Sequence, residues 1–398
     1  MAAPPLQDAS PPTVPPPAPL MYRLLRTPLF MLPAERAHTA GHVLLRIAGA
    51  LPGWDALRRV RSGPARPELQ VRLWERDFAN PVGLAAGFDK DGTSLAGLAG
   101  LGFGLLEAGT VTPRAQPGNP QPRLFRLPAA AAIINRMGFN NAGAAALARR
   151  LEPFRARQRR GAFAGLHIGV NLGKNKETPN EAALEDYRAG MRALYHLADY
   201  LVINISSPNT PQLRELQQRP ALSAMVAGLQ ETRAELRAQH GTWVPLLIKV
   251  APDLSHDELA DVVAVALEQG CDGLIATNTT LGRPGVEGPV AAEAGGLSGA
   301  PLFPRALEVV ATLHRLSGGK LPLVGVGGIA SAEQAYAFIR AGASLVQVYS
   351  ALIYQGPGLP RRITRGLVRL LRRDGFTHIA QAVGVDAPAL AATGEPKP

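Results

Sequence analysis

Eight short apolar runs, each ending in small or polar residues, constrain the fold more than any other feature of this sequence. The runs begin at Val82, Leu105, His167, Leu201, Leu246, Gly273, Leu323 and Leu345. Helical patterns lie between most of them, at 181–198, 219–239, 255–269, 304–316, 331–341 and about 360–373. Strands that alternate with helices pair in parallel, and eight of them in roughly 300 residues are typical of a closed α/β barrel. We therefore predict a (β/α)8 barrel, the TIM barrel.

A doubly wound open sheet is the alternative arrangement of alternating strands and helices. Such a sheet usually carries a glycine-rich dinucleotide loop with the pattern GxGxxG after its first strand. The corresponding segment here is GLAAGFDKDG, residues 83–92, which lacks that pattern. The sequence thus favours the barrel.

The residues at the ends of the eight runs predict a ligand site. In a (β/α)8 barrel the carboxyl ends of all strands meet at one face, where function resides. The residues collected there are Lys90, Thr110, Asn171, Asn204, Ser207, Lys249, Thr277, Asn278, Gly327, Gly328, Tyr349 and Ser350. Each one alone is most simply a strand cap. A whole ring of amides, hydroxyls and two lysines is hard to explain by capping.

Three segments rich in small residues indicate what this site holds. They are LSGAPL (297–302), GVGGIAS (325–331) and QVYSAL (347–352). Small residues let backbone N–H groups approach a phosphate, and the last two loops of barrels commonly bind one. Tight turns are the alternative explanation. Because asparagine offers both a donor and an acceptor, the inventory suits a phosphorylated flavin beside a small ring with amide edges.

Residues 20–61 differ from the barrel in composition. They hold seven arginines against Glu35 and Asp55, and their apolar residues fall on one helical face. Two short helices interrupted near Pro33 are expected. They either pack against the main domain or lie in a membrane interface with their arginines toward lipid phosphates. No apolar stretch approaches the roughly 18 residues that a spanning helix needs.

The net charge and the cysteine content limit the partners and the cellular compartment that we expect for this protein. The formal net charge is +11, and 36 of the 42 basic residues are arginine, which is either a compositional habit or an attraction to an anionic surface. Aromatic residues make up 5%, and the chain has no zinc spacing or aromatic-basic RNA motif, so no nucleic acid partner is expected. No metal is expected either, because histidines and carboxylates lack ligand spacing. A single cysteine, Cys271, fits a reducing compartment.

The strand-end motifs also carry a family resemblance. They include NPVGLAAGFDKDG (80–92), INRMGFNNAG (134–143), INISSPNTPQLR (203–214) and the stretch from GVGGIAS to 357. With the segments between them they cover nearly all of 80–357. The chain closely resembles the quinone-dependent, membrane-associated class of dihydroorotate dehydrogenases. Residues 21–38 resemble the N-terminal helices of that class, which favours the membrane interpretation and a quinone tunnel between the helices.

The resemblance implies an activity and a set of site residues. The activity is oxidation of (S)-dihydroorotate to orotate in pyrimidine (UMP) biosynthesis, with FMN as hydride acceptor and a membrane quinone, ubiquinone or menaquinone, as final acceptor. FMN would be bound by Ala86, Gly87, Phe88, Asp89, Lys90, Thr110, Asn171, Asn204, Lys249, Thr277, Gly299, Gly328, Tyr349 and Ser350. The substrate would be bound by Lys90, Asn135, Arg136, Met137, Gly138, Phe139, Asn204, Asn209, Asn278 and Thr279. Ser207 matches the catalytic base.

The expected organisation has four parts. Residues 1–19 are a disordered Pro-rich tail, 20–61 the membrane and quinone helices, 62–383 the FMN-binding barrel, and 384–398 a flexible C-terminal tail. Because residues 1–19 lack the arginines of a transit peptide, we expect a peripheral protein on the cytoplasmic face of a bacterial inner membrane.

Three rival interpretations remain at this stage. A tRNA dihydrouridine synthase would expect a catalytic cysteine in the mobile loop and an RNA-binding helical domain. A catalytically silent barrel that binds a membrane or partner would not need Lys90, Asn135, Ser207 and Lys249 together. A Ser-His-Asp hydrolase would need a histidine beside Ser207. Cys271 precedes the sixth run, so we expect a buried structural thiol at the opposite end of the barrel.

Overall fold

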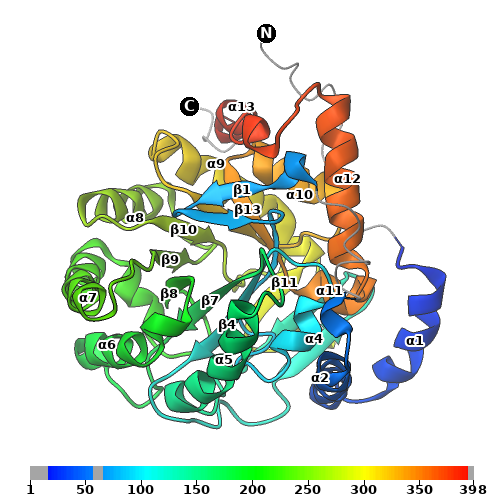
Figure 1. Cartoon of the computed structure of the whole chain (residues 1–398), viewed down its shortest axis with the longest axis horizontal. Coiled ribbons are helices and arrows are strands. Elements are labelled where there is room, and N and C mark those ends of the chain that lie inside the picture. Colours follow the sequence, from blue (N-terminus) through cyan, green and yellow to red (C-terminus); the bar gives the residue numbers. More distant parts are fainter. Residues whose placement is uncertain (1–16, 57–65, 393–398) are drawn as a thin grey trace.

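A computed structural model describes residues 17–56 and 66–392 of the chain. Nearly all of the predicted Pro-rich tail, residues 1–16, lies outside the described residues, as do 57–65 and 393–398. The eight predicted runs form eight parallel strands that close into a barrel in the order β10-β12-β13-β3-β4-β7-β8-β9 (Figure 1). The strands are β3 (Val82–Leu84), β4 (Leu105–Val111), β7 (His167–Leu172), β8 (Tyr200–Asn204), β9 (Leu246–Val250), β10 (Gly273–Ala276), β12 (Leu323–Val326) and β13 (Ala343–Val348). The predicted fold class is confirmed.

Helices surround the barrel and follow the predicted segments closely. They are α5 (Ala144–Arg159), α6 (Ala183–Leu194), α7 (Arg219–His240), α8 (His256–Glu268), α9 (Phe303–Leu316), α10 (Ala332–Arg340) and α12 (Leu359–Arg373), with the short α4 (Leu95–Ala99) and α11 (Ser350–Gln355). The sequence did not predict α5. Each of these helices lies between two strands or after the last one, so the strands are covered on their outer faces (Figure 1).

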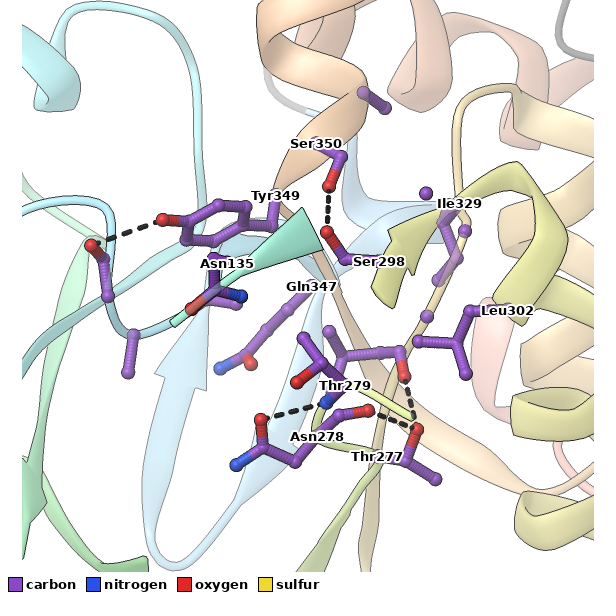
Figure 2. Close-up of a pocket in the computed structure, with 18 of the residues that line it drawn as sticks. Asn135, Thr277, Asn278, Thr279, Ser298, Leu302, Ile329, Gln347, Tyr349 and Ser350 are labelled. Atoms are coloured by element: carbon purple, nitrogen blue, oxygen red, sulfur yellow. Dashed lines mark hydrogen bonds between the residues drawn. The ribbon is translucent and has the colours of Figure 1, made fainter. Parts of the chain in front are cut away.

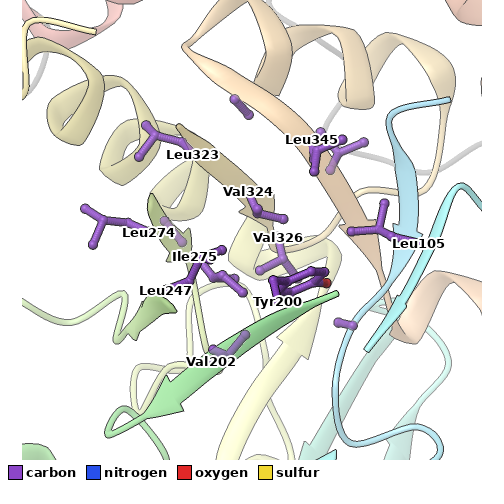
Figure 3. Close-up of a cluster of buried hydrophobic side chains, with 14 of the residues drawn as sticks. Leu105, Tyr200, Val202, Leu247, Leu274, Ile275, Leu323, Val324, Val326 and Leu345 are labelled. Carbon is purple, nitrogen blue, oxygen red and sulfur yellow. The ribbon is translucent and has the colours of Figure 1, made fainter. Parts of the chain in front are cut away.

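Buried apolar side chains pack on both faces of the barrel strands. Figure 3 shows this core, to which the labelled residues contribute from several strands. Leu105, Tyr200, Val202, Leu247, Leu274 and Leu323 are fully buried there. Burial on both faces explains why these strands read as continuous apolar runs and lack an alternating pattern.

A three-stranded antiparallel sheet was not predicted. Its order is β11-β6-β5, with β5 (Leu124–Leu127), β6 (Ala132–Asn135) and β11 (Gly296–Gly299). The segment LSGAPL was expected to supply a loop, but its first residues belong to β11, paired with β6 over four residues. A two-stranded hairpin of β1 (Val71–Leu73) and β2 (Arg76–Phe78) precedes the barrel.

The predicted N-terminal helix pair is present as α1 (Leu20–Met31) and α2 (Ala34–Ala50), interrupted at Pro33. α2 lies directly on α4, where a Cβ atom at Gly97 would stand 2.0 Å from the Leu45 carbonyl oxygen. α1 contacts α11, because the Tyr22 hydroxyl donates to the Ile353 carbonyl oxygen. Within the described residues, every helix is too short or too polar to cross a bilayer.

The C-terminal segment differs from the expected flexible tail. Residues Ala387–Ala392 form α13, which packs against α9. Just before it, the Asp386 carboxylate accepts two hydrogen bonds of 2.6 Å from the buried Arg340 guanidinium. This ion pair anchors the chain, so the predicted flexible tail is wrong for 384–392, and 393–398 lie outside the described residues.

Candidate active site

The carboxyl ends of the barrel strands enclose one large cavity of about 1120 Å³, counted with its open mouth. Seven of the eight barrel strands, β7 being the exception, contribute side chains or turns, and β6 and β11 close one side. Figure 2 shows Asn135, Asn278 and Gln347 converging on this space from three different elements.

All predicted site residues except four line this cavity. The four that do not are Phe88, Asp89, Arg136 and Asn171. Phe88 packs against the rings of His38 and His42 from α2. The Asp89 carboxylate accepts backbone N–H bonds from Thr93 and Ser94 and so caps its own loop.

Arg136 and Asn171 have other partners. The Arg136 guanidinium pairs with Glu293 and stacks over the ring of Phe125, away from the cavity wall. Asn171 is fully buried one layer behind the cavity, where its side chain supports residues that do line it. Sequence position alone cannot separate a contact residue from its support, because both sit at strand ends.

A continuous hydrogen-bond network organises the floor of the site. The Thr110 hydroxyl donates to Asn171 Oδ1 at 2.6 Å, and the Asn204 amide donates to both at 2.8 and 3.0 Å. Asn278 Nδ2 in turn donates to Asn204 Oδ1 at 3.3 Å. Side chains from β4, β7, β8 and the segment after β10 thus fix one another, and a network of this kind holds its members in one orientation.

The buried carboxylate of Glu107 lies beneath this network. It accepts hydrogen bonds from Asn171 Nδ2 at 2.7 Å and from Gln347 Nε2 at 2.7 Å. Burial lowers the pKa of the Lys249 ammonium, and the attraction of Glu107 partly offsets this. Sequence reasoning missed Glu107, although a carboxylate inside the apolar run LLEAGT was a visible signal, because a buried charge needs a partner.

Lys90 is the second cation of the site. Its ammonium donates to Asn140 Oδ1. Burial lowers the pKa of Lys90 to about 7, and repulsion by Arg123 acts in the same direction, against the weaker attraction of Asp91 and Glu35. At neutral pH part of Lys90 with this pKa is the neutral amine, which takes up a proton when an anion binds beside it.

Ser207 lies in the loop after β8, buried at the cavity wall. Its Oγ accepts a hydrogen bond from the Asn209 backbone N–H at 3.2 Å. Arg214 fixes this loop to two others: Nε donates to the Ser206 carbonyl at 3.0 Å, and Nη2 to the Thr279 carbonyl at 2.9 Å. The same guanidinium pairs with Asp253 at 2.7 Å. Arg214 was also missed, because its partners are distant in sequence.

The three small-residue segments converge at the other end of the cavity. The hydroxyls of Ser298 and Ser350 are 2.8 Å apart, which joins β11 to α11 (Figure 2). Gly328 has a φ of +69°, and a Cβ there would stand 2.9 Å from the Gly299 carbonyl oxygen. Only glycine fits so close an approach in that backbone conformation. Backbone groups therefore form this part of the wall.

Two polar atoms of the cavity have no protein partner. Gln347 Oε1 and Thr279 Oγ1 are buried without a hydrogen bond within the described residues. Leaving such a group unsatisfied costs about 1–3 kcal/mol, so both are expected to meet a bound ligand. No group of three or more His, Cys, Asp or Glu side chains in the described ranges is placed to hold a metal ion.

Fold and cavity define a (β/α)8-barrel protein with a polar small-molecule site at the carboxyl ends of its strands. Residues 68–371 match the family model described as dihydroorotate dehydrogenase. The chain is 52% identical over 370 residues to the dihydroorotate dehydrogenase (quinone) of Anaeromyxobacter dehalogenans, covering 92% of this chain and 97% of that protein. It is 54% identical over 368 residues to the protein of the same name from Rhodospirillum rubrum, covering 92% and 94%.

A solved structure of the same family is also similar to this chain. The crystal structure of dihydroorotate dehydrogenase from Eimeria tenella in complex with ferulenol is similar with a TM-score of 0.82 and 40% identity, covering 88% of this chain and 95% of that one. This chain belongs to the dihydroorotate dehydrogenase family. Membership makes the tRNA-modifying and hydrolase interpretations unnecessary.

Proposed function

We propose that this protein oxidises (S)-dihydroorotate to orotate and passes the electrons to a membrane quinone, as a step of pyrimidine biosynthesis. One observation carries the proposal: Ser207 shares a single cavity with Asn135, Asn209, Asn278 and Lys90. The amides match the amide and imide edges of a dihydropyrimidine ring, and the ammonium matches its carboxylate.

The other part of the cavity suits FMN, the cofactor of this family. Gly299, Gly328 and Ser350 surround a space that backbone groups can reach, as a phosphate requires. Lys249, Thr110 and Asn204 lie at the floor, where a ring edge can be held by a cation and amides. The unsatisfied Gln347 Oε1 is buried beside this floor and offers an acceptor to a ring N–H. When bound, FMN supplies the hydride acceptor of the oxidation.

The protein's own residues handle the proton and the orientation of the substrate. Ser207 takes a proton from the ring carbon next to the one that loses hydride. Asn135 and Asn209 hold the ring in register, and the Asn209 amide already donates to Asn135 Oδ1 at 3.1 Å. Arg214 restrains the loop that carries Ser207, so the hydroxyl keeps its position during turnover.

The helices α1 and α2 provide the quinone route and the membrane contact in this proposal. Their outer faces expose large apolar side chains, among them Leu20, Met21, Leu24 and Leu44. Helices of this kind lie in a bilayer interface without spanning it. We propose that they seat the protein on the cytoplasmic face of a bacterial inner membrane and admit quinone toward Phe88 and Tyr349.

Spectroscopy of the purified protein tests this function. The protein should be yellow, lose its visible absorption when dihydroorotate is added without oxygen, and recover it when a quinone is added. NAD should not restore the colour. A colourless protein, or one that dihydroorotate does not bleach, would contradict the proposed reaction. Bleaching without recovery by quinone would retain the chemistry and refute the acceptor.

A further inference from the structure

The helix α12 carries a concentration of positive charge that the reaction does not use. Its 15 residues include six arginines and no acidic residue. The side chains of Arg362, Arg365 and Arg369 line a shallow groove together with Val368 and Arg66, which comes from the segment before β1. Four guanidinium groups thus surround one concave surface.

The charges of this arginine groove are poorly neutralised. Arg66 donates to the Thr364 hydroxyl at 2.9 Å and Arg362 to the Gln355 carbonyl at 2.9 Å, so neutral atoms orient both groups. Burial and repulsion by Arg365 lower the pKa of Arg66, against the attraction of Glu68. Arg365 and Arg369 are exposed, and neither forms an ion pair within residues 17–56 and 66–392. Such a cluster repels itself unless an anion occupies it.

The position of the arginines on the helix adds to this electrostatic repulsion. Arg361 and Arg362 stand in the first turn and a half of α12, where the positive end of the helix dipole disfavours cations. The Arg361 Nε is buried and has no hydrogen-bond partner in the described structure. A phosphate in the groove would neutralise positive charge near this end of the helix, and guanidinium groups bind phosphate oxygens in paired hydrogen bonds.

The groove adjoins the apolar helix α1. The ring of Tyr22 packs against Gly356, and its hydroxyl binds the Ile353 carbonyl. Arg362 of the groove donates to the carbonyl of Gln355, one of the two residues between these contacts. Figure 1 shows α12 following α11, the helix that α1 contacts through Tyr22. The four side chains Leu20, Met21, Leu24 and Leu25 on α1 are each more than 60% exposed. Apolar and cationic surfaces are therefore neighbours.

We propose that the arginine groove of α12 and Arg66 binds the phosphate of an anionic phospholipid headgroup. The inference rests on the proposed seating of α1 in a bilayer. The apolar side chains of α1 insert into a bilayer of any charge, whereas arginines at the surface select for anionic lipids, and the groove adds four arginines to those of α1 and α2. The groove therefore makes attachment depend on lipid charge, and it fixes which side of the barrel faces the membrane.

Vesicle co-sedimentation of the full-length, FMN-loaded protein tests this site. The variant Arg365→Gln/Arg369→Gln removes two exposed charges that have no ion pair. The matched control Arg159→Gln/Arg237→Gln removes two exposed charges that likewise form no ion pair in the described residues, from α5 and α7, which lie away from α12 (Figure 1). Each protein is titrated with vesicles of phosphatidylcholine alone and with vesicles that also contain phosphatidylglycerol. Bleaching by dihydroorotate should be unchanged in both variants, which shows that they are folded.

The expected result is a loss confined to one variant and one lipid. Each surface arginine contributes about 1 kcal/mol to binding an anionic bilayer, so the groove variant should bind anionic vesicles about 30-fold more weakly. Its binding to neutral vesicles should not change. The control should bind as the wild type does, because charges beyond about 10 Å are screened.

Three outcomes would overturn the inference. Equal binding of the groove variant and the wild type would remove the site. An equal loss in the control would assign the effect to net charge alone. Binding of soluble glycerol phosphate to the wild type, lost in the groove variant and without any preference for anionic vesicles, would assign the groove to a soluble phosphate. Failure of the wild type to bind neutral vesicles would instead count against the seating of α1.

Discussion

The mouth of the barrel and the N-terminal helix pair differ in which side chains they bury. The mouth buries polar side chains, whereas the helix pair exposes apolar ones. At the mouth, Asn171, Asn204 and Lys249 are polar and buried. In α1, α2 and the residue after each, ten large apolar side chains are exposed, out of thirteen in the described chain. Burying polar groups and exposing apolar ones both destabilise a free monomer, so each region is completed by something outside the chain.

The two regions are therefore suited to different ligands. The mouth offers hydrogen bonds to polar rings and a phosphate, whereas the helix pair offers an apolar surface to lipid and quinone. In the proposed function the first region carries out reduction of the cofactor and the second its reoxidation. Variants that affect one half-reaction and spare the other test this separation.

Replacing Ser207 with alanine should give the largest effect, and only on the reductive half. Loss of a positioned base lowers a rate by about 10²–10⁴-fold. Stopped-flow bleaching by dihydroorotate should slow by that factor, while reoxidation by quinone of chemically reduced protein stays normal. If bleaching proceeds at the wild-type rate, the base lies elsewhere and the role proposed for this loop is wrong.

Replacing Gly97 with alanine should affect the other half. The new Cβ would stand 2.0 Å from the Leu45 carbonyl oxygen, so α2 must move away from α4. Overpacking of this kind costs about 1–3 kcal/mol, which corresponds to roughly 5- to 150-fold when it falls on the quinone step. Bleaching should be nearly unchanged.

Gly41→Ala provides the control for that displacement. A Cβ at Gly41, also on α2, meets no atom within 4 Å, and alanine favours the helix. Quinone reoxidation should therefore be preserved in this variant. If Gly97→Ala and Gly41→Ala behave alike, or if Gly97→Ala slows bleaching instead, the helices and the mouth are not separable.

The pH dependence of orotate binding tests the role of Lys90 at the polar mouth of the barrel. The pKa of Lys90 is lowered to about 7 by burial, so the ammonium that binds the carboxylate loses its proton as pH rises above 7. Affinity should fall by up to about tenfold per pH unit there and level off below 7, because an anion binds the protonated form. Titration calorimetry of orotate binding, at pH values from below 7 to above 7, measures this change in affinity. Lys90→Met should bind weakly with a flat profile, and an unchanged slope in that variant would assign the titration to another group.

The barrel strands could be predicted from the sequence, whereas the three-stranded sheet beside the site could not. The eight barrel strands are apolar on both faces, so their runs were visible and their polar ends marked the site. The strands β5 and β11 were not: β5 is only half-buried, and β11 reads GLSG, with no alternation. The pairing of β11 with β6 joins segments more than 150 residues apart, which no local pattern records.

The misses in the site and at the C-terminus have one physical cause. Glu107 and Arg214 act through partners on other strands and loops, so their roles depend on the closed barrel. The Ala- and Pro-rich composition after 384 indicates a tail, yet Asp386 is fixed by Arg340 of α10. Composition reports what a segment prefers in isolation, whereas the contacts of Asp386 with Arg340 and of α13 with α9 form only in the folded chain.

Replacing Cys271 with alanine should give the smallest effect in either region. The residue precedes β10 at the amino end of the barrel, opposite the cavity, and its side chain is buried. Burial raises the pKa of the thiol to about 12, so it stays protonated and unreactive at neutral pH. Rates of bleaching and reoxidation should stay within about twofold, with a loss of about 1 kcal/mol in unfolding free energy for the small cavity. A large fall in the bleaching rate without loss of stability would mean that the thiol, and not Ser207, takes the proton.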